Sequence, residues 1–270
     1  MTSRNDRAFW AAAAAIGLAA AIAACSGGES KSRREIRGPA AALGNVGGGQ
    51  ATALKRVDPT TGGTISGTIK WQGGKPAPER IDVSGNPECV KVLKEAIYDE
   101  SLVVNDNETL RFTYVSIDTN DAYEPPADAA LVDQVACRYT PHVFAVMSGQ
   151  KLKIKSSDQF LHNAHYIPAS EANPEKNLAM PAPMTIEKSF VGPDKVKFKC
   201  EVHPWMGAWC FVPTHPFFAV SGADGSFTIT NVPPGTHKLV ARHEKLGEQT
   251  ATVTVETGKT TTQDFTFSKK

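Results

Sequence analysis

The sequence carries almost no net charge and lacks the common catalytic signatures. Its 29 lysines and arginines are balanced by 28 aspartates and glutamates, which leaves a formal charge of +1. Because nucleic-acid binding needs a basic face or stripe, we expect no nucleic-acid partner. No Ser/His/Asp order, nucleophile elbow, phosphate-binding loop or Cys-x-x-Cys-His haem motif is present. The sequence therefore gives no indication of a serine hydrolase, a nucleotide-binding enzyme or a c-type haem protein.

Helical periodicity is also scarce, whereas alternation with a period of two is frequent. Only residues 88–97 show helical spacing, through Val90, Leu93 and Ala96. Apolar and polar residues alternate in four segments, at 65–71, 110–114, 151–155 and 195–200. Such alternation is typical of strands with one solvated face. Together with 22 glycines and 18 prolines, it predicts an all-β chain built as a sandwich of antiparallel sheets.

The N-terminus has an apolar run that is short for a membrane-spanning helix. Arg4 and Arg7 precede this run, which ends in Ile22-Ala23-Ala24-Cys25. The segment resembles a bacterial lipoprotein signal, with residues 1–24 as signal peptide and Cys25 as the lipidated residue. An uncleaved anchor and ordinary secretion are the alternatives. Residues 25–62 have the composition of a flexible linker. We expect a cell-envelope lipoprotein, held in the outer membrane and facing the periplasm or the cell surface.

The C-terminal quarter resembles a carboxypeptidase-regulatory-like, or prealbumin-like, β-sandwich. The resemblance lies in "SGADGSFTITNVPPGTHKLVARH", where Asp224-Gly225 predicts a tight hairpin. We assign residues 215–270 to this module. The segment 63–78, "GTISGTIKWQGGKPAP", looks like the opening of the same module. Residues 63–85 are therefore the first strands of a split sandwich, or two sandwiches follow in series. We interpret His237 and His243 as surface histidines.

A set of soft metal ligands follows the strand at 195–200. Cys200 shares strand parity with Val196 and Phe198, so its thiol is expected to point inward. His203 and Met206 follow within six residues, and His162-Asn163-Ala164-His165 lies upstream. One thiolate, two imidazoles and a thioether form the donor set of blue-copper electron-transfer sites, whereas zinc has little use for a thioether.

The motif Cys-x-x-His-x-x-Met, with a proline after the histidine, resembles the cupredoxins, in particular the amicyanin- and plastocyanin-like group. The resemblance implies a Greek-key β-sandwich, which we place at residues 86–214. It implies one mononuclear type 1 copper bound by His162, Cys200, His203 and Met206. It further implies that Asn163 ties the ligand loops together and that the ring edge of His203 reaches the surface. Pro204 and Trp205 would supply an apolar surround for the metal.

The cysteine count leaves room for both a disulfide and a metal site. Four cysteines remain besides Cys25, so two bridges are arithmetically allowed. We favour one bridge, Cys89–Cys137, which would tie the short helix to a strand and leave Cys200 free. The alternative places Cys200 in a disulfide and removes the copper site. We interpret Cys210 as a small buried residue, His142 as a structural histidine, and His165 as a non-ligand.

These features together predict a single-electron carrier rather than an enzyme, because four protein ligands leave no open position for a substrate. We expect a periplasmic or membrane redox partner, such as a c-type cytochrome, a membrane attachment through the lipid, and no small-molecule substrate. Two alternatives stay open. The chain could sequester or deliver copper, with Met180 and Met184 as further ligands, or it could be a surface interaction module with a structural metal.

Overall fold

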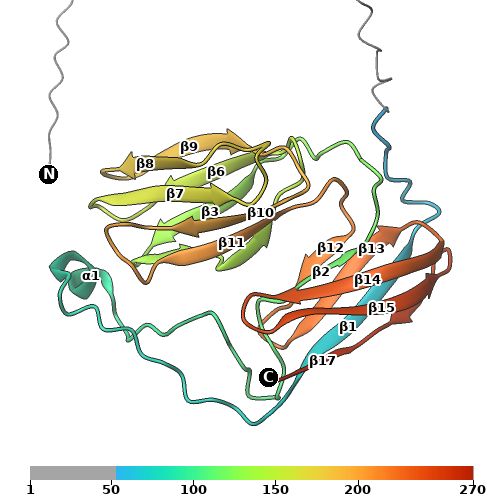
Figure 1. Ribbon diagram of the computed structural model, residues 1–270, viewed down its shortest axis with the longest axis horizontal. Helices are drawn as coiled ribbons and strands as arrows, with labels where there is room; N and C mark the ends of the chain where they lie inside the picture. The colour runs from blue at the N-terminus through green and yellow to red at the C-terminus, as the bar shows by residue number, and fades with distance from the viewer. Residues whose placement is uncertain (1–52, 270) are drawn as a thin grey trace, which may run out of the picture. The chain divides into compact units, whose positions relative to one another are not determined.

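The computed structural model describes residues 53–269, which fold almost entirely into strands (Figure 1). The expected all-β class is therefore confirmed. The signal peptide 1–24, Cys25 and the linker as far as residue 52 lie outside the described residues. In the described part, no helix is both long enough and apolar enough to cross a membrane.

Residues 130–212 form a two-sheet sandwich, here called sandwich A. One sheet has the strand order β5-β11-β10-β7-β8 and the other has the order β4-β3-β6-β9. The bounds of these strands are β3 (Ala130–Val135), β4 (Arg138–Thr140), β5 (Val143–Ala145), β6 (Lys151–Ser156), β7 (His162–Pro168), β8 (Lys176–Met180), β9 (Met184–Ser189), β10 (Asp194–Lys199) and β11 (Gly207–Val212).

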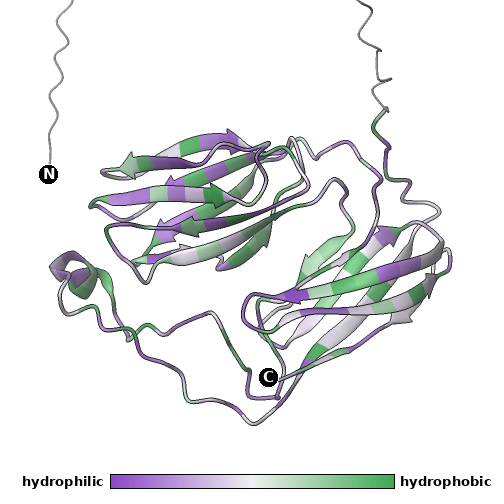
Figure 2. Cartoon of the chain, in the orientation of Figure 1, coloured by the Kyte–Doolittle hydropathy of each residue, from purple (hydrophilic) through white to green (hydrophobic). Residues whose placement is uncertain are grey.

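The core of sandwich A follows from the alternation seen in the sequence. On β6, Leu152 and Ile154 are fully buried, while the intervening Lys153 is exposed. On β10, Val196 and Phe198 point into the same buried cluster as Cys200. The hydropathy colours alternate along these strands accordingly (Figure 2). Burial of one face of each strand stabilises the sandwich and fixes which side chains face the space between the sheets.

A second sandwich, here called sandwich B, combines segments from both ends of the described chain. One sheet has the order β13-β1-β16, with β17 also paired to β1, and the other has the order β12-β2-β14-β15. The bounds of these strands are β1 (Gly63–Gln72), β2 (Tyr114–Ile117), β12 (Phe218–Val220), β13 (Ser226–Val232), β14 (Gly235–His243), β15 (Gly247–Val255), β16 (Thr260–Thr262) and β17 (Phe265–Ser268). Because β1 pairs with three C-terminal strands, the module is split around sandwich A.

The structure differs from the sequence analysis in the placement of several elements. β2 pairs with β12 and β14, so this part of the range expected for the cupredoxin (86–214) belongs to sandwich B. The strand expected at 110–114 is wrong, because β2 begins only at Tyr114. Three of the four sheets are mixed rather than antiparallel, since β3 pairs with β6, β5 with β11, and β1 with β16 and β17 in parallel. The sheet β12-β2-β14-β15 is antiparallel, as expected.

Local packing accounts for three further differences. Gly225 does form a turn, with φ of +77°, but β12 and β13 leave it for different sheets and form no hairpin ladder. His243 is buried rather than exposed. Part of the expected linker is also ordered, because Lys55 exchanges backbone hydrogen bonds with Ala122 and Glu124.

The two sandwiches contact each other through an aromatic pair and a charged network. Tyr114 of β2 stacks on Phe211 of β11, with ring centroids 4.1 Å apart. Glu244 accepts a hydrogen bond from Trp209 Nε1 at 2.7 Å and lies 2.5 Å from His142 Nε2. His142 Nδ1 faces the Gly207 carbonyl oxygen at 3.0 Å. Because both ring nitrogens face acceptors, the doubly protonated ring is favoured. Burial lowers the pKa of His142, but the Glu244 carboxylate outweighs it and raises that pKa.

We predict that the His142–Glu244 pair makes stability fall as the pH rises. The pKa of His142 is higher in the folded protein than its ordinary value of 6.5. Protonation of His142 therefore stabilises the fold fully when the pH is below 6.5. This stabilisation is lost as the pH rises through the raised pKa. Replacing Glu244→Gln should therefore lower the free energy of unfolding by about 1–2 kcal/mol more near pH 6 than near pH 9. Urea titrations at both pH values measure this. The exposed Glu248→Gln is the control, and an equal loss at both pH values would contradict the pairing.

Candidate metal centre

Strand ends and one short loop bring the predicted ligands together. His162 is the first residue of β7, and Cys200 directly follows β10. The intervening loop to β11 is closed by its own backbone, because the Cys200 N–H donates to Met206 O at 3.1 Å and the Met206 N–H to His203 O at 2.9 Å. The paired sheet strands β7 and β10 thus fix two ligands, and the closed loop carries the other two.

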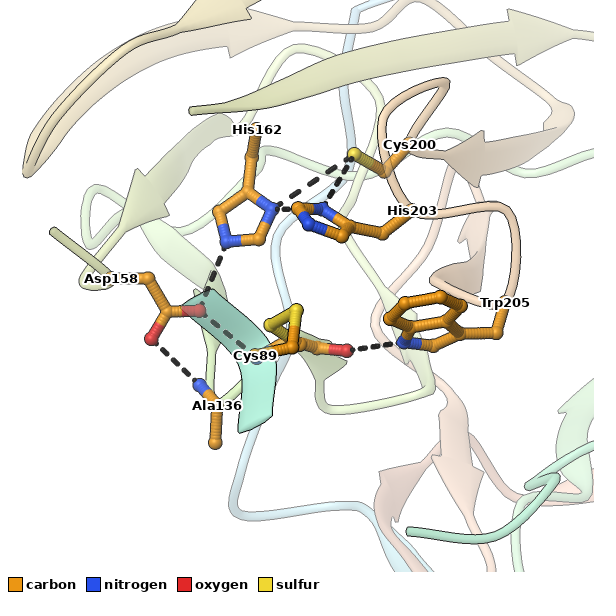
Figure 3. Close-up of a disulfide and its surroundings, with 8 residues drawn as sticks. Cys89, Ala136, Asp158, His162, Cys200, His203 and Trp205 are labelled. Carbon is orange, nitrogen blue, oxygen red and sulfur yellow. Dashed lines mark hydrogen bonds and ion pairs between the residues drawn. A yellow bond between two sulfur atoms is a disulfide. The ribbon is translucent and has the colours of Figure 1, made fainter. Parts of the chain in front are cut away.

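Three donor atoms converge in a buried space. His162 Nδ1 lies 3.0 Å from His203 Nδ1, and Cys200 Sγ lies 3.9 Å and 3.7 Å from these two nitrogens (Figure 3). All three side chains are at most 3% exposed. Met206 is 1% exposed and belongs to the same buried cluster as Cys200. The structure therefore brings the side chains of His162, Cys200 and His203 together at one end of sandwich A, and Met206 is buried in the loop that carries His203.

A buried carboxylate, which the sequence analysis did not include, orients His162. Asp158 Oδ2 lies 2.9 Å from His162 Nε2, so this nitrogen carries a proton and Nδ1 faces the other ligands. The same carboxylate accepts the backbone N–H groups of Ala136 and Cys137, both at 2.9 Å. Burial raises the pKa of Asp158, but these hydrogen bonds outweigh burial and lower it. The four-residue spacing between Asp158 and His162 was the only sequence signal for this contact.

The surroundings of His162, Cys200 and His203 shift the pKa values of all three side chains. Burial lowers the pKa of His162, but Asp158 and the Cys200 sulfur outweigh it and raise that pKa. Burial raises the pKa of the Cys200 thiol, yet hydrogen bonds from His162 and the Asn163 backbone lower it. Burial and the nearby His162 lower the pKa of His203. A metal ion competes with protons for these three ligands, and the lowered pKa values of Cys200 and His203 favour the forms that bind a metal.

This donor set fits copper. Two imidazole nitrogens and a thiolate within 4.8 Å of one another form a His₂Cys group, and a buried thioether side chain lies in the same cluster. Copper accepts this mixture of nitrogen and soft sulfur donors. Cys200 is not in a disulfide. The structure forms the favoured bridge between Cys89 and Cys137, and within residues 53–269 it leaves Cys200 and Cys210 as free thiols.

The predicted neighbours of the ligands take different places. Asn163 ties the two ligand segments together, since its Oδ1 accepts the Glu201 N–H at 2.6 Å. Trp205 packs beside His203, with ring centroids 5.4 Å apart, and donates from Nε1 to Cys137 O at 3.0 Å. Pro204 is exposed. The expectation that His203 reaches the surface is wrong for this structure, because that ring is only 3% exposed.

The remaining candidate residues have other surroundings, except that Met180 pairs directly with His162 across the β7–β8 ladder. His165 is held by Glu175 and Glu201, each 2.6 Å from a ring nitrogen. His142 bonds to Gly207 and Glu244, as described above. Cys210 is fully buried on β11, and burial raises its pKa well above the ordinary value. Met180 is fully buried, and Met184 packs against the core of sandwich A.

Comparison with known proteins finds similarity in two parts of the chain. Residues 214–268 match the family model of the carboxypeptidase regulatory-like domain, which confirms that resemblance. The chain resembles a copper-containing nitrite reductase (NirK) from Thermus scotoductus SA-01, with 18% identity and a TM-score of 0.29 over 36% of this chain and 25% of that one. It thus spans only a quarter of the length of that reductase. No curated protein matches the sequence.

Two smaller copper proteins are also similar. A purple cupredoxin from Nitrosopumilus maritimus shares 19% identity and a TM-score of 0.26 over 31% of this chain and 98% of that one. A mutant amicyanin in its reduced Cu(I) form shares 20% identity and a TM-score of 0.28 over 36% of this chain and 97% of that one. At such low similarity, the copper assignment depends on the geometry of His162, Cys200 and His203.

We predict that Asp158→Asn destabilises the metal-free protein. The substitution keeps the shape but loses the charge that accepts two backbone N–H groups and one imidazole N–H. Leaving these buried donors poorly paired should cost about 1–3 kcal/mol of unfolding free energy at neutral pH. Urea unfolding of the apo protein measures it. The exposed Glu175→Gln, which also removes a carboxylate beside a histidine, should change stability by less than about 0.5 kcal/mol. Equal effects would mean that the Asp158 carboxylate has no special role.

Proposed function

We propose that the chain is a type 1 copper protein that carries single electrons in the cell envelope. The observation that supports this most directly is the convergence of two imidazole Nδ1 atoms and the Cys200 sulfur in one buried space. When bound there, copper would supply a one-electron Cu(II)/Cu(I) couple. The residues expected to hold it are His162, Cys200 and His203, with Met206 as the axial donor.

The surroundings support electron transfer because they resist rearrangement. Asp158 fixes His162, which stands at the start of a paired strand. Asn163 fixes the backbone next to Cys200, and Trp205 is anchored to Cys137. A site held from several elements changes little when the charge of the metal changes. Because Met206 and Trp205 also pack around the site, water is kept away from the ligands and the potential is set by protein groups.

The same features disfavour catalysis and ready metal exchange. Four protein side chains would fill the coordination positions, so we propose that the chain is not an enzyme. The ligands of a delivery protein must open to a receiving partner, whereas His162, Cys200 and His203 are at most 3% exposed. Met180, a candidate additional ligand for delivery, is fully buried. We assign no chemistry to sandwich B.

The partner and the membrane attachment are part of the same proposal. Leu161 and Val202 directly flank ligand residues and are 46% and 40% exposed. Apolar side chains beside a redox site suit a small, transient contact with a redox protein, for which a c-type cytochrome is our candidate. Lipidation at Cys25 would hold the protein at the outer membrane.

We predict that the copper-loaded protein has an intense visible absorption band from thiolate-to-Cu(II) charge transfer. Replacing Cys200→Ser should abolish this band, because no other thiolate in sandwich A faces the two imidazoles. Cys210→Ala is the matched control, since it removes the other free thiol of residues 53–269 and should leave the band intact.

Met206→Leu should keep the band and raise the reduction potential, because a donor that stabilises Cu(II) is lost. Spectroscopy and voltammetry check these outcomes. A blue Cys200→Ser protein would refute the ligand assignment.

A further inference from the structure

The helix α1 (Pro87–Val92) and its flanking chain lie outside the strands of both sandwiches (Figure 1). The flanking chain is held mainly to itself, because the Ile81 N–H donates to Ile97 O and the Asp99 N–H to Glu79 O. The helix is six residues long and has no side-chain cap at its N-terminus. A helix this short is not stable alone. It is attached to sandwich A by the Cys89–Cys137 disulfide and by Val83 and Leu93, which pack against the core of sandwich A on either side of the helix.

This disulfide lies against the metal ligands. Cys89 Sγ, Cys137 Sγ and a ring nitrogen of His203 are all within 4.8 Å of one another. Both half-cystines are fully buried, and His203 is 3% exposed. On the outer side of the disulfide, Val90 is 51% exposed. The sulfur pair and α1 thus cover the histidine that the sequence analysis expected to find at the surface.

Cys137 also connects to the other ligands through its backbone. Its N–H donates to Asp158 Oδ2, the same oxygen that holds His162 Nε2 (Figure 3). Its carbonyl oxygen accepts the Trp205 Nε1–H from the ligand loop. One residue thus lies next to His203 through its sulfur, supports His162 through Asp158, and anchors the ligand loop through Trp205.

The turn that carries Cys137 adopts an unfavourable backbone conformation. Ala136 and Cys137 are the two central residues between β3 and β4, and both have left-handed φ values, of 51° and 52°. Turns of this kind strongly favour asparagine and glycine. Ordinary residues keep such a conformation only where their surroundings hold it firmly. Here Asp158 accepts the N–H groups of both turn residues, and the disulfide to Cys89 fixes the side chain of Cys137.

We propose that the Cys89–Cys137 cross-link is the cover and support of the metal centre. It closes the route from solvent to His203, and it holds the 136–137 turn where Asp158 can orient His162. Access to His203, for a metal ion or for a reagent, then requires α1 to move away. That the covered site binds a metal rests on the proposed function. That the disulfide and α1 close off His203 concerns only side chains of this protein.

The test compares the accessibility of His203 in the metal-free full chain. Diethyl pyrocarbonate acylates unprotonated imidazole, and peptide mass spectrometry locates the product. In Cys89→Ser/Cys137→Ser, the cover can open locally, and His203 should react at least about tenfold faster than in the wild type. His215, which is 5% exposed and outside sandwich A, is the internal reference and should react at an unchanged rate. Val90→Ser is the matched control, because it alters the outer face of α1 and keeps the cross-link.

A second readout separates opening of the cover from loss of the fold. Cys210 is fully buried on β11, so its alkylation by a maleimide reports on sandwich A as a whole. Faster labelling of His203 with unchanged Cys210 supports the cover. Equal acceleration of both residues, or no acceleration of His203, overturns it. Absence of the thiolate-to-Cu(II) band in the wild type would instead refute the proposed function and leave the labelling result intact.

Discussion

One buried carboxylate links the candidate metal centre to the backbone that surrounds it. Asp158 accepts two N–H groups from the left-handed turn at Ala136 and Cys137, and a third bond from the ring of His162. Removing an anion from water is costly unless several donors compensate for it, and here three donors do so. The contact decides which ring nitrogen of His162 faces Cys200 and His203. The direction of the His162 ring and the conformation of the Ala136–Cys137 turn both depend on this carboxylate.

The division of the chain into two sandwiches places sandwich B in contact with the chain next to the candidate site. Sandwich B takes β1 and β2 from before sandwich A and its remaining strands from after it, so both ends of sandwich A are held. The Tyr114–Phe211 stack and the His142–Glu244–Trp209 network join the two. In this network, the carbonyl oxygen of Gly207, which directly follows Met206, is hydrogen-bonded to the His142 ring. Sandwich B thus contacts the chain immediately after the ligand loop, although it supplies no ligand.

Local patterns predicted the parts of this protein that burial alone determines. Alternation at 151–155 and 195–200 predicted β6, β10 and the inward direction of Cys200, because a strand has only two faces. The pattern failed at 110–114, where the alternation begins four residues before the start of β2 at Tyr114. It also did not predict that three of the four sheets are mixed, because alternation shows only that one face of a strand is buried and not the direction of the neighbouring strand.

The sequence by itself determined the all-β class, the resemblance of 214–268 to a regulatory-like domain, and the four candidate ligand residues with their spacing. It could not decide which strands pair across the chain, so the split of sandwich B around sandwich A emerged only in three dimensions. The same holds for the burial of His203 under the disulfide and for the role of Asp158. These features depend on contacts between segments far apart in the chain or on side-chain directions at a loop, and no local pattern records them. Tertiary structure alone decided them, because burial and hydrogen bonding depend on what the whole fold places beside each group.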